Sequence, residues 1–285
     1  MVSPTKIFII PYRNRHFLKI HFEKYMQYIL EDIPKETYEI YFVHQYDKRP
    51  FNRGALKNIG FLAMRDKYPN EYKNITFIFN DIDTMPLEKN YLNYDTTIGV
   101  VKHFYGFDFA LGGIFSITGT DFEKCGGFPN YWAWGLEDNA IQHRVLDKKI
   151  KLDRSHFHKF CDEHILHVPY DIKRILSKQQ AWRHKGNTES FSDIKNLKYT
   201  FKNEFIQVTN FDTKVNPNND NYVSQMLTNK IRPDTNFIPK DSGIKLVENK
   251  FGMGINKTGT FYNNQAKFGN ISMKGNNTFK NFKLQ

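Results

Sequence analysis

The chain has 285 residues, of which 40% are hydrophobic and 16% aromatic, enough to bury the core of one large α/β domain. It contains no run of 18 apolar residues and no signal-peptide pattern, which predicts a cytoplasmic or otherwise soluble intracellular protein without a membrane anchor. Two cysteines exclude a disulfide scaffold, and a net charge of +11, of which +7 falls in residues 214–285, calls for an anionic partner without defining the chemistry of the first 213 residues.

Strands and helices are predicted to alternate through the first 80 residues. Short apolar runs predict the strands, and apolar residues at helical spacing predict the helices between them. The predicted order is strand 6–10, helix 17–30, strand 38–43, helix 54–64 and strand 75–79. This alternation indicates parallel strands joined by crossover helices, and hence an α/β fold.

The second half of the chain predicts further strands and a change of composition. Strands are expected at 98–101 and 113–118, a helix at 136–146, and a closing strand or hairpin at 193–210, whereas 164–186 lacks a clear long element. Residues 215–221 read as a linker. We therefore expect one domain over 1–213 and a basic, small β-rich appendage over 214–285.

Two carboxylates follow the third predicted strand. Asp81 and Asp83 lie one residue apart directly after the apolar run 75–79, at the end of a parallel strand where ligands gather in such sheets. Carboxylates at this place suit a hard divalent ion such as Mg²⁺ or Mn²⁺, which commonly bridges to substrate phosphates. The alternative is an ordinary turn or helix cap.

Arginines follow the first two predicted strands. Arg13 and Arg15 come after strand 6–10, and Arg53 follows strand 38–43 by a short loop. All three are expected at one edge of the sheet, where planar guanidinium groups can hold phosphate beside the metal. Any one of them alone is more typical of a solvated surface charge.

Aromatic and imidazole side chains follow later in the chain. Trp132 and Trp134 lie in a glycine-rich stretch before an acidic pair; each could offer a flat face to a sugar ring or belong to the core. His164 and His167 form a HxxH pair that can supply imidazole to Mn²⁺ or Zn²⁺, with a structural or surface role as the alternative.

In order along the chain, these motifs resemble the β-1,4-galactosyltransferase family, including the xylosyl-type enzymes of glycosaminoglycan linkers. The resemblance covers about residues 6–210, and the block GFPNYWAWGLED at 127–138 is its most specific part. The other matches are PYRNRH at 11–16, FNRGALKNIGF at 51–61, DID at 81–83, GGIFSIT at 112–118, HILH at 164–167 and a weak LKYTF at 197–201.

The resemblance implies a GT-A fold and inverting, Mn²⁺-dependent transfer of a hexose or N-acetylhexosamine from a UDP-sugar to a saccharide hydroxyl. It assigns the catalytic base to Asp138 and the metal to Asp83, His164 and His167. The donor nucleotide is assigned to Pro11, Arg13, Arg15, Phe51, Arg53, Asp81, Asp83 and His167. The acceptor side is assigned to Trp134, Gly135, Glu137 and Gly113.

Three positions depart from the family pattern. Ala110 stands where galactose-using members usually have Tyr, so the donor sugar stays open between galactose and N-acetylgalactosamine. Asn139 replaces an acidic residue that usually follows the base. His164 stands where many members have Met. The family also implies a lid near 168–185 that closes over the donor, for which we expect protection from proteolysis on adding Mn²⁺ and UDP.

Other classes of function stay open at this stage. A nucleic-acid-binding protein or metal-dependent phosphoesterase would explain the basic tail and the paired aspartates, but a two-metal nuclease would need further carboxylates near them, and the sequence offers none. A nucleic-acid partner is therefore not expected. A second alternative is a relic of the same fold that binds glycan or UDP without turnover. The tail could recognise the acceptor, form a homo-oligomer or merely pack.

Overall fold

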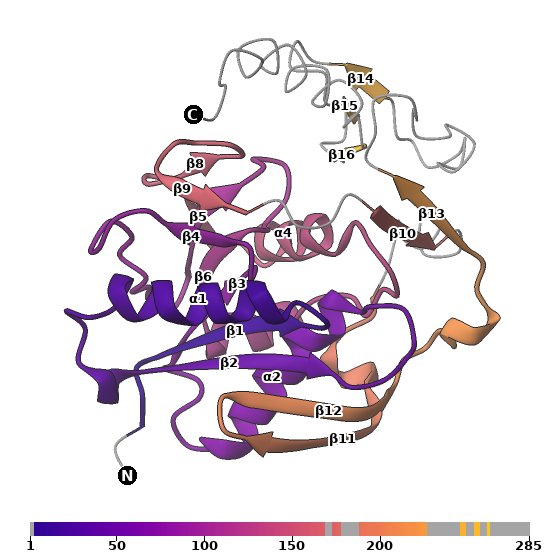
Figure 1. Cartoon of the computed structure of the whole chain (residues 1–285), viewed down its shortest axis with the longest axis horizontal. Coiled ribbons are helices and arrows are strands. Elements are labelled where there is room, and N and C mark those ends of the chain that lie inside the picture. Colours follow the sequence, from indigo (N-terminus) through magenta and orange to yellow (C-terminus); the bar gives the residue numbers. More distant parts are fainter. Residues whose placement is uncertain are drawn as a thin grey trace, which may run out of the picture.

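A nine-stranded mixed sheet forms the centre of the protein (Figure 1). The computed structural model describes residues 3–168, 173–177 and 188–226, and the backbone of three short strands beyond residue 245. Along the sheet the strands follow the order β11 (Lys195–Lys202), β12 (Phe205–Asp212), β2 (Tyr38–Gln45), β1 (Lys6–Tyr12), β3 (Thr76–Asn80), β6 (Ile114–Thr118), β5 (Val100–Gly106) and β7 (Lys151–Asp153), with β8 (His158–Lys159) paired to β5.

The first three predicted strands are parallel, as expected. β1 lies between β2 and β3 and pairs parallel with both, so the ends that carry the arginines and aspartates of the sequence motifs reach one edge. β6 instead runs antiparallel to β3 and to β5. Only residues 107–113 connect β5 to β6, which is too short for a crossover and favours a hairpin.

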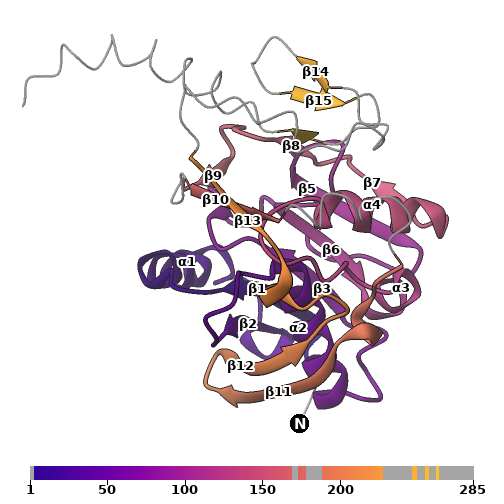
Figure 2. The ribbon, with the colours of Figure 1, turned by 90° about the vertical axis from the view of Figure 1, so that its right-hand side faces the viewer.

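Helices cover both faces of the sheet, because alternate residues of β1 point to opposite sides. Phe8 and Ile10 pack in a core with α1 (His16–Ile29), whereas Ile7 and Ile9 pack in a second core with α2 (Arg53–Lys67) and α3 (Gly119–Cys125). Figure 2 shows α1 on one side of the sheet and α2 and α3 on the other. α4 (Glu137–Asp147) follows and contributes Ile141 and Val145 to the second core.

Close packing places α2 firmly on the sheet. A Cβ atom on Gly60 would lie 2.6 Å from Ile9 Cγ2 and 2.9 Å from Val43 Cγ2, so glycine lets the helix approach the strands. Phe61, one residue on, is fully buried among other aromatic rings, and burying such a ring stabilises the fold by roughly 1.5–3 kcal/mol. The position of Arg53 at the start of α2 is thereby fixed.

Several short elements were not predicted. They are α3, β4 (Thr84–Pro86), β7, β8, β9 (Ile165–His167), β10 (Lys173–Ser177) and β13 (Tyr222–Met226). Elements of two to seven residues carry too little periodicity to be recognised. The expected strand at 98–101 begins later, at Val100, because Gly99 takes a φ of +88° just before β5. The hairpin expected at 193–210 is confirmed as β11 and β12.

Residues at and just after the predicted domain boundary contact the sheet domain. The Trp132 indole Nε1 donates hydrogen bonds to Thr213 Oγ1 at 2.8 Å and to the Val215 carbonyl at 3.1 Å, and β13 pairs antiparallel with β10. Further on, β14 (Leu246–Glu248), β15 (Gly254–Asn256) and β16 (Phe261–Tyr262) pair antiparallel. The division at residue 213 stays a prediction.

The segment predicted to form a lid, 168–185, lies largely outside the described residues, which include only 168 and 173–177 of it. None of the helices in the described part of the chain has the length and apolar character needed to span a bilayer.

Candidate active site

Three carboxylates converge on one arginine at the carboxyl edge of the sheet. The Arg53 guanidinium contacts Asp81 Oδ2 at 2.6 Å, Glu137 Oε1 at 2.7 Å and Asp138 Oδ2 at 2.7 Å. Arg53 is the first residue of α2, Glu137 and Asp138 open α4, and Asp81 follows β3. The structure therefore gathers four predicted site residues from three separate segments into one charged cluster.

A second cation lies beneath this cluster. Lys57 is fully buried, with its ammonium 3.4 Å from Asp138 Oδ1 and 3.8 Å from Asp81 Oδ1. One turn of helix separates it from Arg53, so both cations face the same carboxylates. The Phe128 ring, 4.8 Å from Nζ, covers the ammonium. Sequence reasoning missed Lys57, although its i+4 spacing from Arg53 was a usable signal.

Burial and charge shift the titration of this cluster. Burial lowers the pKa of the Arg53 guanidinium, but the surrounding Asp138, Asp81 and Glu137 carboxylates outweigh it and hold that pKa well above its usual value. Burial raises the pKa of Asp81, but Arg53 and then Lys57 outweigh it, and the net pKa is lowered. Arg53 and Asp81 are therefore held in their charged forms.

Asp83 behaves differently from its neighbour. Burial, and then the negative charge of Asp81, raise its pKa above the ordinary value. Within the described residues, Arg15 forms an ion pair with Asp83, its Nη1 lying 3.6 Å from Asp83 Oδ2, a longer contact than Arg53 makes with Asp81. The positive charges near Asp83 therefore offset burial and the Asp81 charge only in part.

His167 is brought beside Asp83 by a short strand pair. β4 and β9 pair antiparallel with Thr84 opposite His167, and the Val168 amide donates to the Asp83 carbonyl at 2.8 Å. His167 Nδ1 lies 2.9 Å from the Tyr105 hydroxyl. This contact occupies Nδ1, so Nε2 is the ring nitrogen that could ligate a metal, as in metal-binding histidines whose other nitrogen is hydrogen-bonded. A carboxylate and an oriented imidazole fit Mn²⁺ chemically.

His164, the third predicted metal ligand, lies in a different group. Its Nδ1 is 2.9 Å from Asp162 Oδ1, and its ring stacks on Tyr91 with a 5.1 Å centroid separation. Within residues 3–168, 173–177 and 188–226, the group of ligating atoms close enough to share an ion comprises His158, Asp162 and His164. The structure therefore does not bring His164 together with Asp83 and His167.

Buried amides hold the tryptophan-rich loop against α2. Asn58 Nδ2 donates to the Phe128 carbonyl at 2.8 Å and to Asn130 Oδ1 at 2.9 Å, and its Oδ1 accepts from the Phe128 amide. Asn52, which caps α2 through the Ala55 amide at 2.9 Å, also donates to the Asn130 carbonyl. These bonds fix the loop that delivers Glu137 and Asp138 to Arg53.

The two tryptophans of this loop take different roles. Trp132 is buried and stacks on Phe211 at 5.1 Å, which makes it a core residue. Trp134 is 37% exposed and its amide donates to the Ile175 carbonyl of β10 at 2.8 Å. Gly135 follows with a φ of +120°, a backbone conformation that favours glycine. Trp134 is therefore only partly buried, unlike Trp132.

Glycines allow the backbone to approach Asp138. A Cβ atom on Gly112 would lie 2.5 Å from Asp138 Oδ2, and the Leu111 amide donates to the Asp138 carbonyl at 2.9 Å. Gly113 takes a φ of +68°, and its carbonyl accepts from the Asp81 amide at 3.0 Å. The β5–β6 turn therefore forms one wall beside the predicted base.

The remaining predicted donor residues lie at the ends of β1 and β2. Pro11 is buried in β1 opposite Val43. The Arg13 guanidinium lies 5.3 Å from the Phe51 ring centroid and donates to the Arg49 carbonyl, and burial lowers its pKa. Phe51 is half-buried. A cationic group above an aromatic ring is a suitable surface for a nucleotide.

Residues that depart from the family pattern are also placed. Ala110 is buried, and Asn139 donates to the Phe109 carbonyl at 3.0 Å.

A buried histidine supports the β5–β6 turn. His103 Nε2 lies 3.0 Å from the carbonyls of both Tyr105 and Gly112, and its Nδ1 accepts from Arg154 Nε at 3.1 Å. Burial lowers the pKa of His103 to about 3, so it serves as a neutral brace under the β5–β6 turn.

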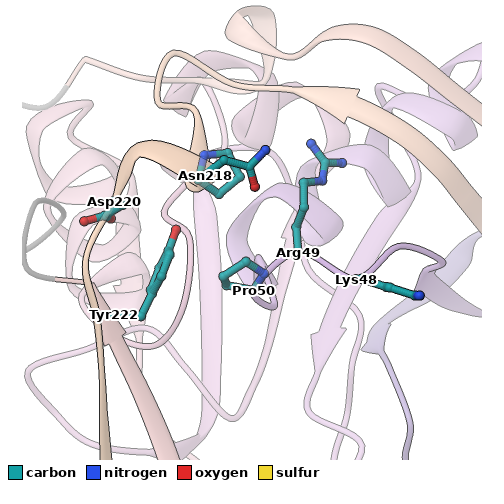
Figure 3. A pocket seen from close by; sticks show the side chains of 7 residues that line it. Lys48, Arg49, Pro50, Asn218, Asp220 and Tyr222 are labelled. Atoms are coloured by element: carbon teal, nitrogen blue, oxygen red, sulfur yellow. The ribbon is translucent and has the colours of Figure 1, made fainter.

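A cavity of about 400 Å³ lies next to this region, between the end of β2 and the segment that precedes β13 (Figure 3). None of the predicted site residues lines it, although Pro50 on its wall adjoins Phe51. Its lining residues are Lys48, Arg49, Pro50, Pro217, Asn218, Asp220 and Tyr222.

The sheet order and the helices on both faces define a GT-A glycosyltransferase fold. The catalytic domain of Drosophila β1,4-galactosyltransferase 7, solved in complex with xylobiose, superposes with a TM-score of 0.59 at 21% identity, covering 76% of this chain and 97% of that one. A mutant of the Drosophila enzyme, solved with manganese, UDP-Gal and xylobiose, superposes with a TM-score of 0.58 at 19% identity, covering 76% of this chain and 97% of that one. The GT-A fold expected from the sequence is confirmed.

Two family models match adjoining parts of the chain: the N-terminal region of glycosyl transferase group 7 over residues 3–95 and the N-terminal domain of galactosyltransferase over residues 94–168. Xylosylprotein 4-beta-galactosyltransferase of Caenorhabditis elegans is 32% identical over 156 residues, 51% of this chain and 52% of that protein. Beta-1,4-galactosyltransferase 2 of Cricetulus griseus is 27% identical over 212 residues, 70% of this chain and 53% of that protein. The chain belongs to the β-1,4-galactosyltransferase family, and it spans about half the length of these curated relatives.

Proposed function

We propose that the protein is an inverting, metal-dependent glycosyltransferase that moves a hexose or N-acetylhexosamine from a UDP-sugar to a saccharide hydroxyl. The single observation that carries this proposal is the cluster in which Asp138, Glu137 and Asp81 meet on Arg53, beside the pair of Asp83 and His167. These side chains lie at one edge of the sheet, which supports the roles proposed for them below: Asp138 as base, Asp83 and His167 as metal ligands and Arg53 as a phosphate-binding group.

Asp138 is the proposed base. An acceptor hydroxyl must lose its proton as it attacks the anomeric carbon, and one carboxylate within hydrogen-bonding reach can accept that proton. Arg53 and Lys57 keep Asp138 in contact with positive charge in the free protein. Gly112, which has no side chain, lets the β5–β6 turn pack closely against Asp138 Oδ2. Glu137 and Trp134 would then contact the acceptor.

Arg53 is proposed to exchange partners when the donor binds. A diphosphate offers a guanidinium the same bidentate oxygens as a carboxylate, so Arg53 can move from Asp138 to the donor and release that carboxylate for proton transfer. Arg13 and Arg15 would hold the remaining diphosphate charge, with the uridine beside Phe51. Lys57 stays beneath the carboxylates, since it is fully buried.

Asp83 and His167 would hold Mn²⁺, with His164 as a third ligand that must first leave Asp162. When bound, the ion stabilises negative charge on the departing nucleotide. The complexes of the Drosophila relative with manganese, UDP-Gal and xylobiose support both the donor class and the metal. The small, buried Ala110 leaves room for either galactose or N-acetylgalactosamine.

The test is a transfer and hydrolysis panel with UDP-galactose, UDP-N-acetylgalactosamine and UDP-glucose, with and without Mn²⁺. Asp138→Asn should lower transfer by about 10²–10⁴-fold while leaving UDP affinity within a few-fold. Asp147→Asn, at the exposed far end of the same helix, is the matched control and should transfer normally.

Two results would contradict the proposal. An active Asp138→Asn variant would refute the assignment of the base. UDP binding by the parent without any hydrolysis or transfer would indicate a protein that keeps the fold and the nucleotide site but has no turnover.

A further inference from the structure

Three metal-ligating side chains converge where β8 leads into β9. His158 Nδ1 lies 3.2 Å from Asp162 Oδ1, and His164 Nδ1 lies 2.9 Å from the same oxygen. The ligating atoms of all three residues lie within 4.8 Å of one another. The side chain of His158 is 14% exposed and that of His164 is 48% exposed, so the group is open to solvent on one side.

These separations match a metal site. Two ligands of a tetrahedral zinc ion, at bond lengths of 2.0–2.1 Å, lie about 3.3 Å apart, close to both imidazole–carboxylate distances here. Asp162 Oδ1 also accepts from the His164 amide at 3.0 Å, which fixes the carboxylate. The Tyr91 ring contacts both imidazoles, with centroid separations of 5.1 Å to each, and so limits their rotation.

We propose that His158, Asp162 and His164 form a second metal site, distinct from Asp83 and His167 and selective for a borderline ion such as Zn²⁺ or Co²⁺. Two imidazoles and one carboxylate are the ligands that Zn²⁺ favours, and the affinity of such a site rises from Mn²⁺ through Co²⁺. The exposed side of His164 leaves an open position for water.

The two sites share His164, and this consequence rests on the proposed function. An imidazole held at the second site by Asp162 and a zinc ion cannot also ligate manganese beside Asp83. Zinc at the second site therefore opposes completion of the catalytic site, and occupation of one site weakens the other by the same factor. The protein would sense zinc through a ligand that its proposed catalytic metal also needs.

Binding is tested with Co²⁺ alone, followed by visible absorption and calorimetry on the metal-free full chain without a His tag. The parent should bind one Co²⁺ with the absorption of a low-coordinate N/O site, and so should Asp83→Asn. His158→Ala should weaken this binding by at least about tenfold. The control is His156→Ala, an exposed histidine two residues away, which should bind like the parent.

The outcomes separate this proposal from the proposed function. Equal Co²⁺ affinity in His158→Ala and His156→Ala would overturn the second site, as would binding that is lost in Asp83→Asn and kept in His158→Ala. Loss of Mn²⁺-dependent transfer in Asp83→Asn with Co²⁺ binding retained would support both sites. A parent that binds Co²⁺ through His158 but never transfers sugar would refute the function and leave the second site standing.

Competition between Zn²⁺ and Mn²⁺ for His164 is measured separately, through the rate of sugar transfer. At fixed Mn²⁺, added Zn²⁺ should inhibit transfer by the parent and by His156→Ala, whereas His158→Ala should resist zinc when compared with its own zinc-free rate. Equal zinc inhibition in all three proteins would refute the sharing of His164.

Discussion

Replacing Arg53 with methionine removes a side chain that contacts Asp81, Glu137 and Asp138 together. Methionine preserves much of the volume and the helix propensity at the start of α2. The change leaves three carboxylates side by side, with the buried Lys57 as the cation nearest to Asp81 and Asp138. We expect a large loss of stability at neutral pH.

The size of the loss follows from burial and charge. A pair of unit charges roughly 4 Å apart attract by about 4 kcal/mol at an effective dielectric constant of 20, and Arg53 makes three such contacts. Much of this attraction only offsets desolvation, so removing the partner of a buried pair typically costs about 3–5 kcal/mol. The Glu137 side chain is 5% exposed, so water cannot replace the guanidinium there. We expect about 4 kcal/mol.

The loss should depend on pH. In the parent, Arg53 and Lys57 lower the pKa of Asp81 against the effect of burial, so this carboxylate contributes stability above its unfolded value of about 3.9 and loses it as pH falls through the lower folded pKa. The variant lacks most of this contribution, and its crowded carboxylates take up protons more readily. The difference in unfolding free energy should therefore be largest near neutral pH and narrow as pH falls below about 4.

Urea unfolding of parent and variant between about pH 2 and pH 7 measures this difference. Arg65→Met is the matched control, because Arg65 lies in the same helix, is 36% exposed and approaches Glu123 only at 4.0 Å; a change of under about 0.5 kcal/mol is expected. A loss below about 1 kcal/mol for Arg53→Met, or one that does not vary with pH, would refute the charged cluster.

Other changes test the walls and supports of the site. Gly112→Ala puts a Cβ within 2.5 Å of Asp138 Oδ2 and should reduce transfer more than UDP binding; unchanged transfer would contradict the close approach. Tyr105→Phe removes the hydroxyl that orients His167 Nδ1 and should weaken Mn²⁺ affinity by about 10–100-fold, measured by calorimetry, with equal affinity as the contrary result. Because the pKa of His103 is lowered to about 3, the folded protein keeps this imidazole neutral while the unfolded chain takes up a proton below about 6.5, so stability falls from about pH 6.5 toward pH 3; acid unfolding should be less steep in His103→Gln, and identical curves would dispute this.

Much of the fold was predictable because its central strands are apolar runs. The alternation of strands and helices through residue 80 gave the parallel pairs β1–β2 and β1–β3. The strand that became β6 was predicted, but its antiparallel pairing with β3 and the two-residue or three-residue strands were not, since pairing partners are set by contacts distant in sequence. β4, for example, pairs with β9 about 80 residues later.

The candidate site likewise contains some residues that could be predicted from the sequence and others that could not. Residues within recognisable motifs, such as Asp81, Arg53 and Asp138, could be named from sequence, and they lie together in the structure. Lys57 was missed although its i+4 spacing from Arg53 put it on the same face of the helix, whereas Tyr105 could not be named, because nothing local reveals that a strand tyrosine contacts His167, 62 residues away. The placement of His164 with Asp162 likewise depends on a turn that the HxxH pattern does not encode.

The proposed function depends most on one arrangement, in which Asp83 and His167 hold a divalent ion against the diphosphate of a nucleotide. Crystals grown with Mn²⁺ and UDP, measured at the manganese absorption edge, test it directly. We predict one anomalous peak within bonding distance of Asp83 and His167 Nε2, with the uridine against Phe51. A nucleotide bound elsewhere, or a peak that touches neither side chain, would contradict it.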